Sequence, residues 1–445
     1  MINYKKLFYP FFTLKQKTIV FLIAGSYLIL SFKLLRFVYS YSENVLFWDQ
    51  WDIFDQVLKG DSLFNLFFYQ HNEHRMGVSL LITKMLAQLT GWDVRFETII
   101  IGIVIILSST IALVIKQKIT HRLEIYDILI PFLFLNLYQY ENLIWGFQIG
   151  FTLPLLFLMT AVLLFASKGS PKTYACLLLL SFVSAYTHLH GLFVSLLIAV
   201  YFLIKFQAAS ENNSTARRKY FIYLAISVLV LLSYFVGYHR SRFLGAENFN
   251  LIEFFQYIFY QTNSLTGNYN KHLLGYMLIP SIAIWAFVSL LISSIRTKNI
   301  IYTYPILSLF LFSLLFSVMT AYGRIGAGGI NGAYTSRYVT LMIPLYLGIY
   351  IYLVKFLNIT IKNALMTFMV VFFVFVSSQN NHFNYTYAAG RKTALKNWTT
   401  CYKRFENLKY CQAVTAIDIY HSPDAIDLES KLQFLKRNSL SFFGK

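Results

Sequence analysis

Long runs of apolar residues, separated by short polar segments, occupy most of the chain from Thr18 to Ser378. Each run is near the roughly 17 to 25 residues that a helix needs to cross a bilayer. The apolar positions are consecutive rather than alternating, which excludes the strands of a membrane barrel. The pattern predicts an all-α polytopic membrane protein with about 11 transmembrane helices, near residues 18–39, 97–116, 125–140, 145–166, 173–187, 189–206, 219–238, 273–295, 300–320, 338–357 and 362–378.

Composition and charge agree with this pattern and add an orientation. Of the 445 residues, 57% are hydrophobic and only 13% are charged, which is too apolar for a soluble protein of this size. The net charge of +19 comes from basic residues that gather in every second loop, namely Lys5, Lys6, Lys15, Lys17, Lys116, Lys118, Arg122, Lys168, Lys172, Lys205, Arg217, Arg218, Lys219, Arg296, Lys298, Lys355 and Lys362. This positive-inside distribution predicts a cytoplasmic N-terminus and an outward C-terminus, without a nucleic-acid partner.

The first outward loop, 40–96, is acidic in a basic chain. Its segment FWDQWDIFDQ carries two tryptophans and three carboxylates, at Trp48, Asp49, Trp51, Asp52 and Asp55. If the segment is helical, carboxylates three residues apart share a face, and the tryptophans lie at headgroup level. Two interpretations stay open: a general base or ligand site, or an acidic helix cap with aromatic belt residues. Further along the loop, residues 76–89 predict a helix lying in the membrane interface.

Other polar groups lie on the same predicted side. The QHNEHR segment carries His71, Glu73, His74 and Arg75. Its spacing does not match a zinc motif, so we expect contacts to a sugar or phosphate, or a solvated turn. The remaining candidates are Glu141 in an aromatic loop, His190 with its neighbour His188, and Arg324 and Arg337, which flank a glycine-rich loop and suit bidentate phosphate contacts.

The C-terminal tail, 379–445, has a different composition from the membrane domain, 1–378, and contains no further apolar run. We therefore expect a small outward appendage. Two of the chain's three cysteines, Cys401 and Cys411, lie in this tail, and Cys176 lies in a predicted span. On the oxidising side of a membrane the tail pair predicts a disulfide, with two reduced thiols as the alternative.

The motifs WDQWD, QHNEHR, ENLIWGFQ and GAYTSRY follow an early acidic loop and resemble a bacterial branch of the GT-C superfamily of membrane glycosyltransferases. Within it, the chain is similar to the serotype-converting O-antigen glucosyltransferases of enteric bacteria. The resemblance implies transfer of a sugar, such as glucose, from a polyprenyl-phosphate donor to a lipid-linked surface glycan. It places the enzyme in the bacterial inner membrane with its site facing the periplasm.

The resemblance also implies roles for residues. Asp49 or Asp52 would be the base of an inverting displacement, and Arg324, Arg337 or Arg75 would stabilise the departing phosphate. Trp48 and Trp51 would stack on sugars. No cofactor or protein metal site is expected, although an acidic outward loop leaves a divalent cation open.

Three other classes of function remain as alternatives. A transporter or flippase of lipid-linked sugars would carry charged groups or broken helices inside the spans, which the sequence does not show clearly. A polysaccharide polymerase would usually have its large loop late in the chain, and here the large loop is early. A scaffold would not need acids and arginines gathered on one side.

Overall fold

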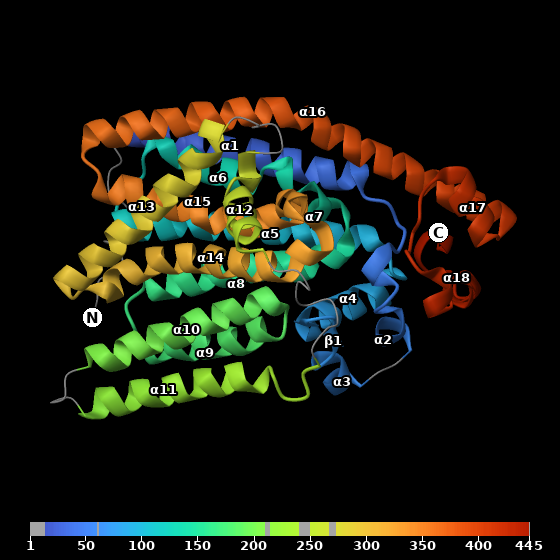
Figure 1. The fold of residues 1–445 in the computed structure, drawn as a ribbon, viewed down its shortest axis with the longest axis horizontal. Coiled ribbons are helices and arrows are strands. Elements are labelled where there is room, and N and C mark those ends of the chain that lie inside the picture. The colour runs from blue at the N-terminus through green and yellow to red at the C-terminus, as the bar shows by residue number, and fades with distance from the viewer. Residues whose placement is uncertain (1–13, 60–61, 210–213, 240–249, 267–272, 445) are drawn as a thin grey trace.

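The computed structural model describes residues 14–59, 62–209, 214–239, 250–266 and 273–444. Within these ranges the chain is helical except for one short antiparallel hairpin, β1 (Gln70–His71) and β2 (His74–Arg75), in which His71 pairs with His74. The all-α prediction is therefore confirmed. The long helices lie side by side, and a smaller group of short helices is attached at one end of the bundle (Figure 1).

Seven helices within the described ranges are long and apolar enough to cross a membrane. They are α1 (Leu14–Tyr41), α5 (Val94–Thr120), α8 (Ile149–Phe165), α10 (Leu189–Ala208), α13 (Leu273–Thr297), α14 (Ile300–Gly328) and α15 (Ser336–Phe356). Three further predicted spans are also helical, as α9 (Pro171–Ala185), α11 (Ser214–Ser233) and the first part of α16 (Ile359–Phe405). α15 lies at the centre, because nearly all of its residues are buried.

The prediction of one helix over 125–140 is wrong. This segment is a series of short pieces: η3 (Ile125–Ile128), α6 (Leu129–Phe134), η4 (Leu137–Gln139), α7 (Tyr140–Ile144) and η5 (Gly146–Gln148). The break after α6 is stabilised by polar side chains. The side-chain oxygen Oδ1 of Asn136 accepts from the backbone N–H of Tyr138 at 2.8 Å, and Gln139 Nε2 donates to the backbone carbonyl of Phe134 at 2.6 Å. Such side-chain bonds replace the helical backbone bonds.

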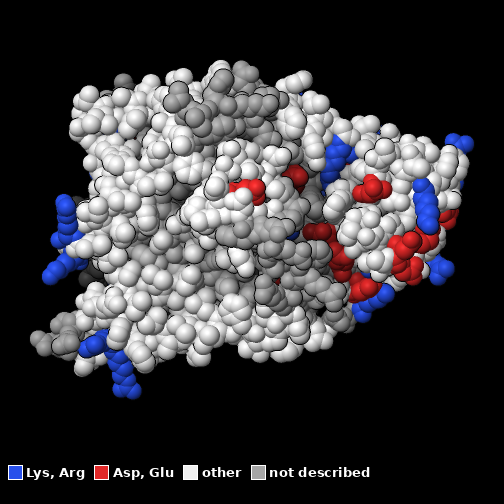
Figure 2. Space-filling view, in the orientation of Figure 1, with Lys and Arg blue, Asp and Glu red and all other residues white. Residues whose placement is uncertain are grey.

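Charged residues are distributed unevenly over the visible face of the molecule (Figure 2). At the end where α10 is followed by α11 and α13 by α14, the charged side chains that project are Lys and Arg, whereas Asp and Glu gather at the opposite end, over the short helices, together with further Lys and Arg. Inside the basic end, the Lys116 ammonium and the Asp127 carboxylate form a fully buried ion pair at 2.7 Å. Removing one partner would leave an uncompensated buried charge, so this pair holds α5 to η3.

The loop between α1 and α5, which carries the acidic segment, and the C-terminal tail fold together at the end of the bundle with the short helices. The loop provides α2 (Phe54–Leu58), α3 (Leu63–Phe67) and α4 (Gly77–Thr90), the last of which is the helix predicted at 76–89. The tail provides the end of α16, α17 (Leu408–Thr415), η8 (Pro423–Ile426), α18 (Leu428–Arg437) and η9 (Ser441–Phe443). Apolar residues of both segments form one core, with Trp51, Phe54, Trp92, Trp398 and Leu432 among its buried members.

This shared core has two consequences for the predicted tail. Helix α16 continues without interruption from Ile359 to Phe405, so the predicted boundary at 378/379 falls inside a helix. Cys401 in α16 and Cys411 in α17, the predicted pair, form a disulfide. The tail is thus tied covalently to itself and packed noncovalently against the loop that carries the acidic segment. We call this joint body, loop 42–93 with 391–444, the outer unit.

Candidate functional site

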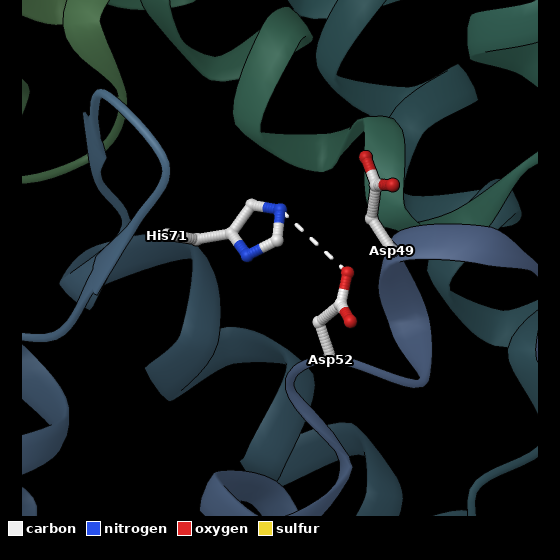
Figure 3. A group of neighbouring side chains, drawn as sticks. All are labelled: Asp49, Asp52 and His71. Atoms are coloured by element: carbon white, nitrogen blue, oxygen red, sulfur yellow. Dashed lines mark ion pairs between the residues drawn. The ribbon is translucent and has the colours of Figure 1, made fainter. Parts of the chain in front are cut away.

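The acidic segment forms a tight turn between α1 and α2, at the end of the bundle with the short helices. Trp48–Gln50 make one turn of 3-10 helix, η2, and Trp48 adopts a left-handed φ of 50°. This turn brings Asp49 and Asp52 together with His71 of β1, with side-chain oxygen and nitrogen atoms within 4.8 Å of one another (Figure 3). Asp52 points its carboxylate toward His71, and Asp49 extends its own away from that pair. The predicted shared face of Asp49 and Asp52 is therefore present, built by a turn rather than a regular helix.

A buried carboxyl group that the sequence did not single out stabilises this turn through hydrogen bonds. Glu97, near the start of α5, is 1% exposed and accepts hydrogen bonds from Trp92 Nε1 at 3.0 Å and Gln50 Nε2 at 3.5 Å. Gln50 in turn accepts from the Phe47 amide at 3.2 Å. Gly146 packs so closely on Glu97 that a Cβ there would lie 2.6 Å from Glu97 Oε2. Glu97 thus fixes the backbone on which Asp49 is carried.

The two aspartates of the turn have different surroundings. The Asp49 carboxylate makes no hydrogen bond or ion pair within the described residues, and burial raises its pKa, with the charge of Asp52 adding to the rise and His71 opposing it. Asp52 instead accepts a 2.5 Å hydrogen bond from the Tyr420 hydroxyl and lies 4.0 Å from His71 Nε2. A desolvated carboxylate without a donor is the better proton acceptor of the two.

Asp49 faces a polar cavity of about 70 Å³ that is partly open to solvent. The cavity lies between the hairpin, the start of α10, the end of α14 and the start of α15. It brings together most of the predicted binding residues, which came from four separate segments of the sequence. Its charged, imidazole and amide lining residues are Asp49, His71, Asn72, Glu73, His74, His188, His190, Arg324 and Arg337.

Two arginines form the positive side of this cavity. The Arg324 guanidinium pairs with Glu73 at 3.2 Å, whereas Arg337 Nε is buried without a hydrogen-bond partner within the described residues. Glu141 does not line the cavity; its carboxylate accepts from Ser336 Oγ at 2.8 Å and from the Arg337 amide at 3.2 Å. The prediction that Glu141 binds substrate is therefore replaced by a different role, which is to cap α15 and position Arg337.

Three histidines form one wall of the cavity. The rings of His74 and His188 stack with centroids 3.8 Å apart, and those of His188 and His190 with centroids 4.5 Å apart. His188 and His190 both reach the wall because the chain is extended at His188, which lies between the end of α9 and the start of α10. Burial, together with neighbouring imidazoles, lowers the pKa of His74 and His188 well below the ordinary value, so both are neutral. Such rings offer polar contacts without charge.

Three predicted binding residues serve the fold instead. Trp51 is fully buried and its Nε1 donates to the Leu46 carbonyl, so it cannot stack on a sugar. Asp55 pairs with Lys59 at 2.8 Å and Lys431 at 3.5 Å, away from the cavity. The Arg75 guanidinium donates to the carbonyls of Phe68, Tyr234 and Val236, which leaves no free edge for a phosphate. Trp48, by contrast, is 40% exposed at the mouth of the site.

Asp49, Asp52 and His71 are also the set within the described residues that a divalent cation would use. They offer two carboxylates and one imidazole, so the other coordination positions of such an ion would be filled by water or substrate. One oxygen of Asp52 already accepts the Tyr420 hydroxyl.

A second groove, of about 330 Å³ and with an apolar exposed surface, lies beside the polar cavity. It is bounded by α12 (Leu251–Thr262), α13, α14 and α15. Helix α14 connects the two spaces, because Ser317 and Val318 line the groove while the next two residues, Met319 and Thr320, line the cavity. The site therefore offers polar and apolar binding surfaces in immediate succession.

Searches with protein-family models, among curated proteins and among solved structures found no match to this chain. The features of the site that bear on its chemistry are a carboxylate with a raised pKa, two arginines and a neighbouring apolar groove.

Proposed function

We propose that the protein is an inverting glycosyltransferase that moves a sugar, such as glucose, from polyprenyl phosphate to a lipid-linked surface glycan. The observation that carries this proposal is the cavity in which Asp49, whose carboxylate makes no hydrogen bond within the described part of the chain, faces Arg324 and Arg337. The base needed on one side of a glycosyl transfer and the positive charge needed on the other are therefore present together. The resemblance of the motifs to membrane glycosyltransferases supports the same chemistry.

The proposed reaction is a single displacement. An acceptor hydroxyl oxygen attacks the anomeric carbon, the bond from that carbon to the phosphate oxygen breaks, and the phosphate departs with the bonding electron pair. Asp49 takes the proton of the acceptor hydroxyl. Burial raises the pKa of Asp49, which brings its basicity closer to the range useful for general base catalysis.

The departing polyprenyl phosphate needs positive charge rather than a proton. Arg337 has a buried Nε without a partner within the described residues, and Arg324 is held in place by Glu73. Two guanidinium groups whose positions are fixed before the reaction stabilise a developing phosphate charge and cost little reorganisation. The apolar groove along α14 then suits the polyprenyl chain of the donor, since the surface that it exposes is apolar.

The charge distribution supports an orientation for this chemistry. With the basic end of the bundle in the cytoplasm, the cavity and the outer unit face the periplasm of a bacterial inner membrane. The broken segment 125–148 begins beside the buried Lys116–Asp127 pair at the basic end and ends near the acidic turn, where Trp145 Nε1 donates to the Phe47 carbonyl. In the proposed arrangement this segment counts as an interrupted span, so the proposed number of crossings stays at about 11.

The direct test is transfer of label from polyprenyl-phospho-[14C]glucose, and then from other polyprenyl-phospho-hexoses, to lipid-linked glycan in membranes. We expect Asp49→Asn to reduce the rate at least about a hundredfold, as loss of a general base does. Arg337→Gln should reduce the maximal rate as well. Asp55→Asn is the matched control, because Asp55 lies in the same segment but pairs with lysines outside the cavity.

Full transfer by Asp49→Asn would contradict the assignment of the base. If the wild type transfers no sugar from any donor but moves labelled donor across the membrane of reconstituted vesicles, the protein is a flippase instead.

A further inference from the structure

The C-terminal tail contacts the acidic turn directly. The Trp48 amide donates to the Ile419 carbonyl at 2.8 Å, and the Trp48 and His421 rings lie 5.7 Å apart. Between them in sequence, Tyr420 donates its hydroxyl proton to Asp52 Oδ1 at 2.5 Å. The turn is therefore held by Glu97 from the membrane side and by three consecutive tail residues from the outside.

The bond between Tyr420 and Asp52 is well protected. Tyr420 is 5% exposed, and its partner is a carboxylate, so the hydrogen bond is charge-assisted and stronger than one between neutral groups. Burial, and then the neighbouring Asp52, raise the pKa of Tyr420, which keeps the phenol protonated and able to donate. One oxygen of Asp52 is thus engaged at neutral pH, and the other lies toward His71.

We propose that Tyr420 is a positioning residue of the site: it holds Asp52 as an oriented carboxylate beside Asp49, and leaves Asp49 as the carboxylate that receives the acceptor proton. The inference rests on the proposed function, and it assigns different tasks to the two aspartates. Asp49 is faced by His71, Asp52, Arg324 and Arg337. Because one oxygen of Asp52 accepts from Tyr420 and the other lies toward His71, Asp49 is the carboxylate of the pair that is left to line the cavity.

Tyr420→Phe removes only the hydroxyl and is the test variant. The tail supplies a matched control, since Tyr402 donates to Glu429 at 2.7 Å within the outer unit and far from the cavity. Tyr402→Phe therefore loses the same kind of bond without touching the acidic turn. Thermal unfolding of both variants shows whether the outer unit remains folded.

The first readout does not depend on catalysis. Carbodiimides label accessible carboxyl groups, and mass spectrometry of peptides that contain residues 49 and 52 reports each site. In Tyr420→Phe we expect Asp52 to be labelled about tenfold faster than in the wild type, because its carboxylate has lost the hydrogen-bond partner that holds it. Tyr402→Phe should label at the wild-type rate. An unchanged Asp52 rate in Tyr420→Phe overturns the inference.

The second readout is transfer from polyprenyl-phospho-[14C]hexose to lipid-linked glycan. We expect Tyr420→Phe to lower kcat about tenfold with KM within twofold, because the loss falls on the proton-transfer step rather than on binding. Tyr402→Phe should leave both constants unchanged. Equal losses in the two variants would show that the tail acts only through stability, and would overturn the inference.

The two readouts separate this inference from the proposed function. If Asp52 is labelled faster in Tyr420→Phe but the wild type transfers no sugar from any donor, the Tyr420–Asp52 coupling is supported and the glycosyltransferase is refuted. Wild-type transfer that Tyr420→Phe does not slow supports the glycosyltransferase and refutes the positioning role.

Discussion

Gly146 offers a sharp test of how the acidic turn is supported. A Cβ at this position would lie 2.6 Å from Glu97 Oε2, 2.8 Å from Glu97 Cβ and 2.9 Å from Val94 Cγ1. All three distances are shorter than van der Waals contact, and Glu97 is buried with its hydrogen bonds to Trp92 and Gln50. Overpacking of a buried site costs about 1–3 kcal/mol. Displacement of the Glu97 bonds adds about 1 kcal/mol.

We therefore expect Gly146→Ala to lower the free energy of unfolding by about 2–4 kcal/mol, the sum of these two effects. Gly390→Ala is the matched control, because Gly390 lies in α16 with nothing within 4 Å of an added Cβ. In a helix that change is expected to be neutral or to stabilise by up to about 1 kcal/mol. Chemical denaturation in mild detergent, followed by intrinsic fluorescence, measures both variants. If Gly146→Ala and Gly390→Ala have equal stability, the proposed support by Glu97 is wrong.

Three further outcomes are expected. Glu141→Gln should lower transfer while leaving donor binding nearly intact, measured as kcat against KM, because the cap that positions Arg337 is weakened. The pKa values of His74 and His188 lie below the ordinary 6.5, so the unfolded chain binds protons that the folded protein does not. The free energy of unfolding contributed by these neutral histidines should be fully present above about pH 6.5 and be lost as the pH is lowered. Denaturation curves recorded from pH 8 to 5 measure this loss. Reduction of Cys401–Cys411 should destabilise the outer unit by about 2–3 kcal/mol in the same measurement, from the entropy of a short loop.

The pattern of apolar residues in the sequence predicted the all-α class and the positions of the long helices. Apolar runs predicted the long helices because each must satisfy its backbone internally and present an apolar surface. The segment 125–140 was mispredicted for a local reason: Asn136 and Gln139 bond to nearby backbone groups and interrupt the helix, and hydropathy does not register such bonds. An apolar run therefore predicted the presence of this segment in the bundle but not its conformation.

The site was predictable only in part. Asp49, Arg324 and Arg337 were found because charged groups at one end of apolar spans stand out from their surroundings. Trp51 and Arg75 were assigned to substrate because sequence alone does not distinguish an exposed polar group from one whose bonds are satisfied inside the protein.

Tyr420 was missed because its partner Asp52 is 368 residues away, and no local pattern marks such a contact. Glu97 was counted as the first residue of a span, although its carboxyl organises the turn.

The common core of the first outward loop and the tail constrains how the protein is made. The loop between α1 and α5 is translated early, but residues that complete its core, such as Trp398 and Leu432, are translated only after the seven long apolar helices of the described ranges. Domains generally fold as units during synthesis, and this one lacks a large part of its core until α16 and α18 have been made. The acidic turn therefore reaches its folded state only after Tyr420 has been translated. A chain that stops before Tyr420 would keep those seven helices but lack a complete candidate site, so such a truncation should disable the protein before it affects membrane insertion.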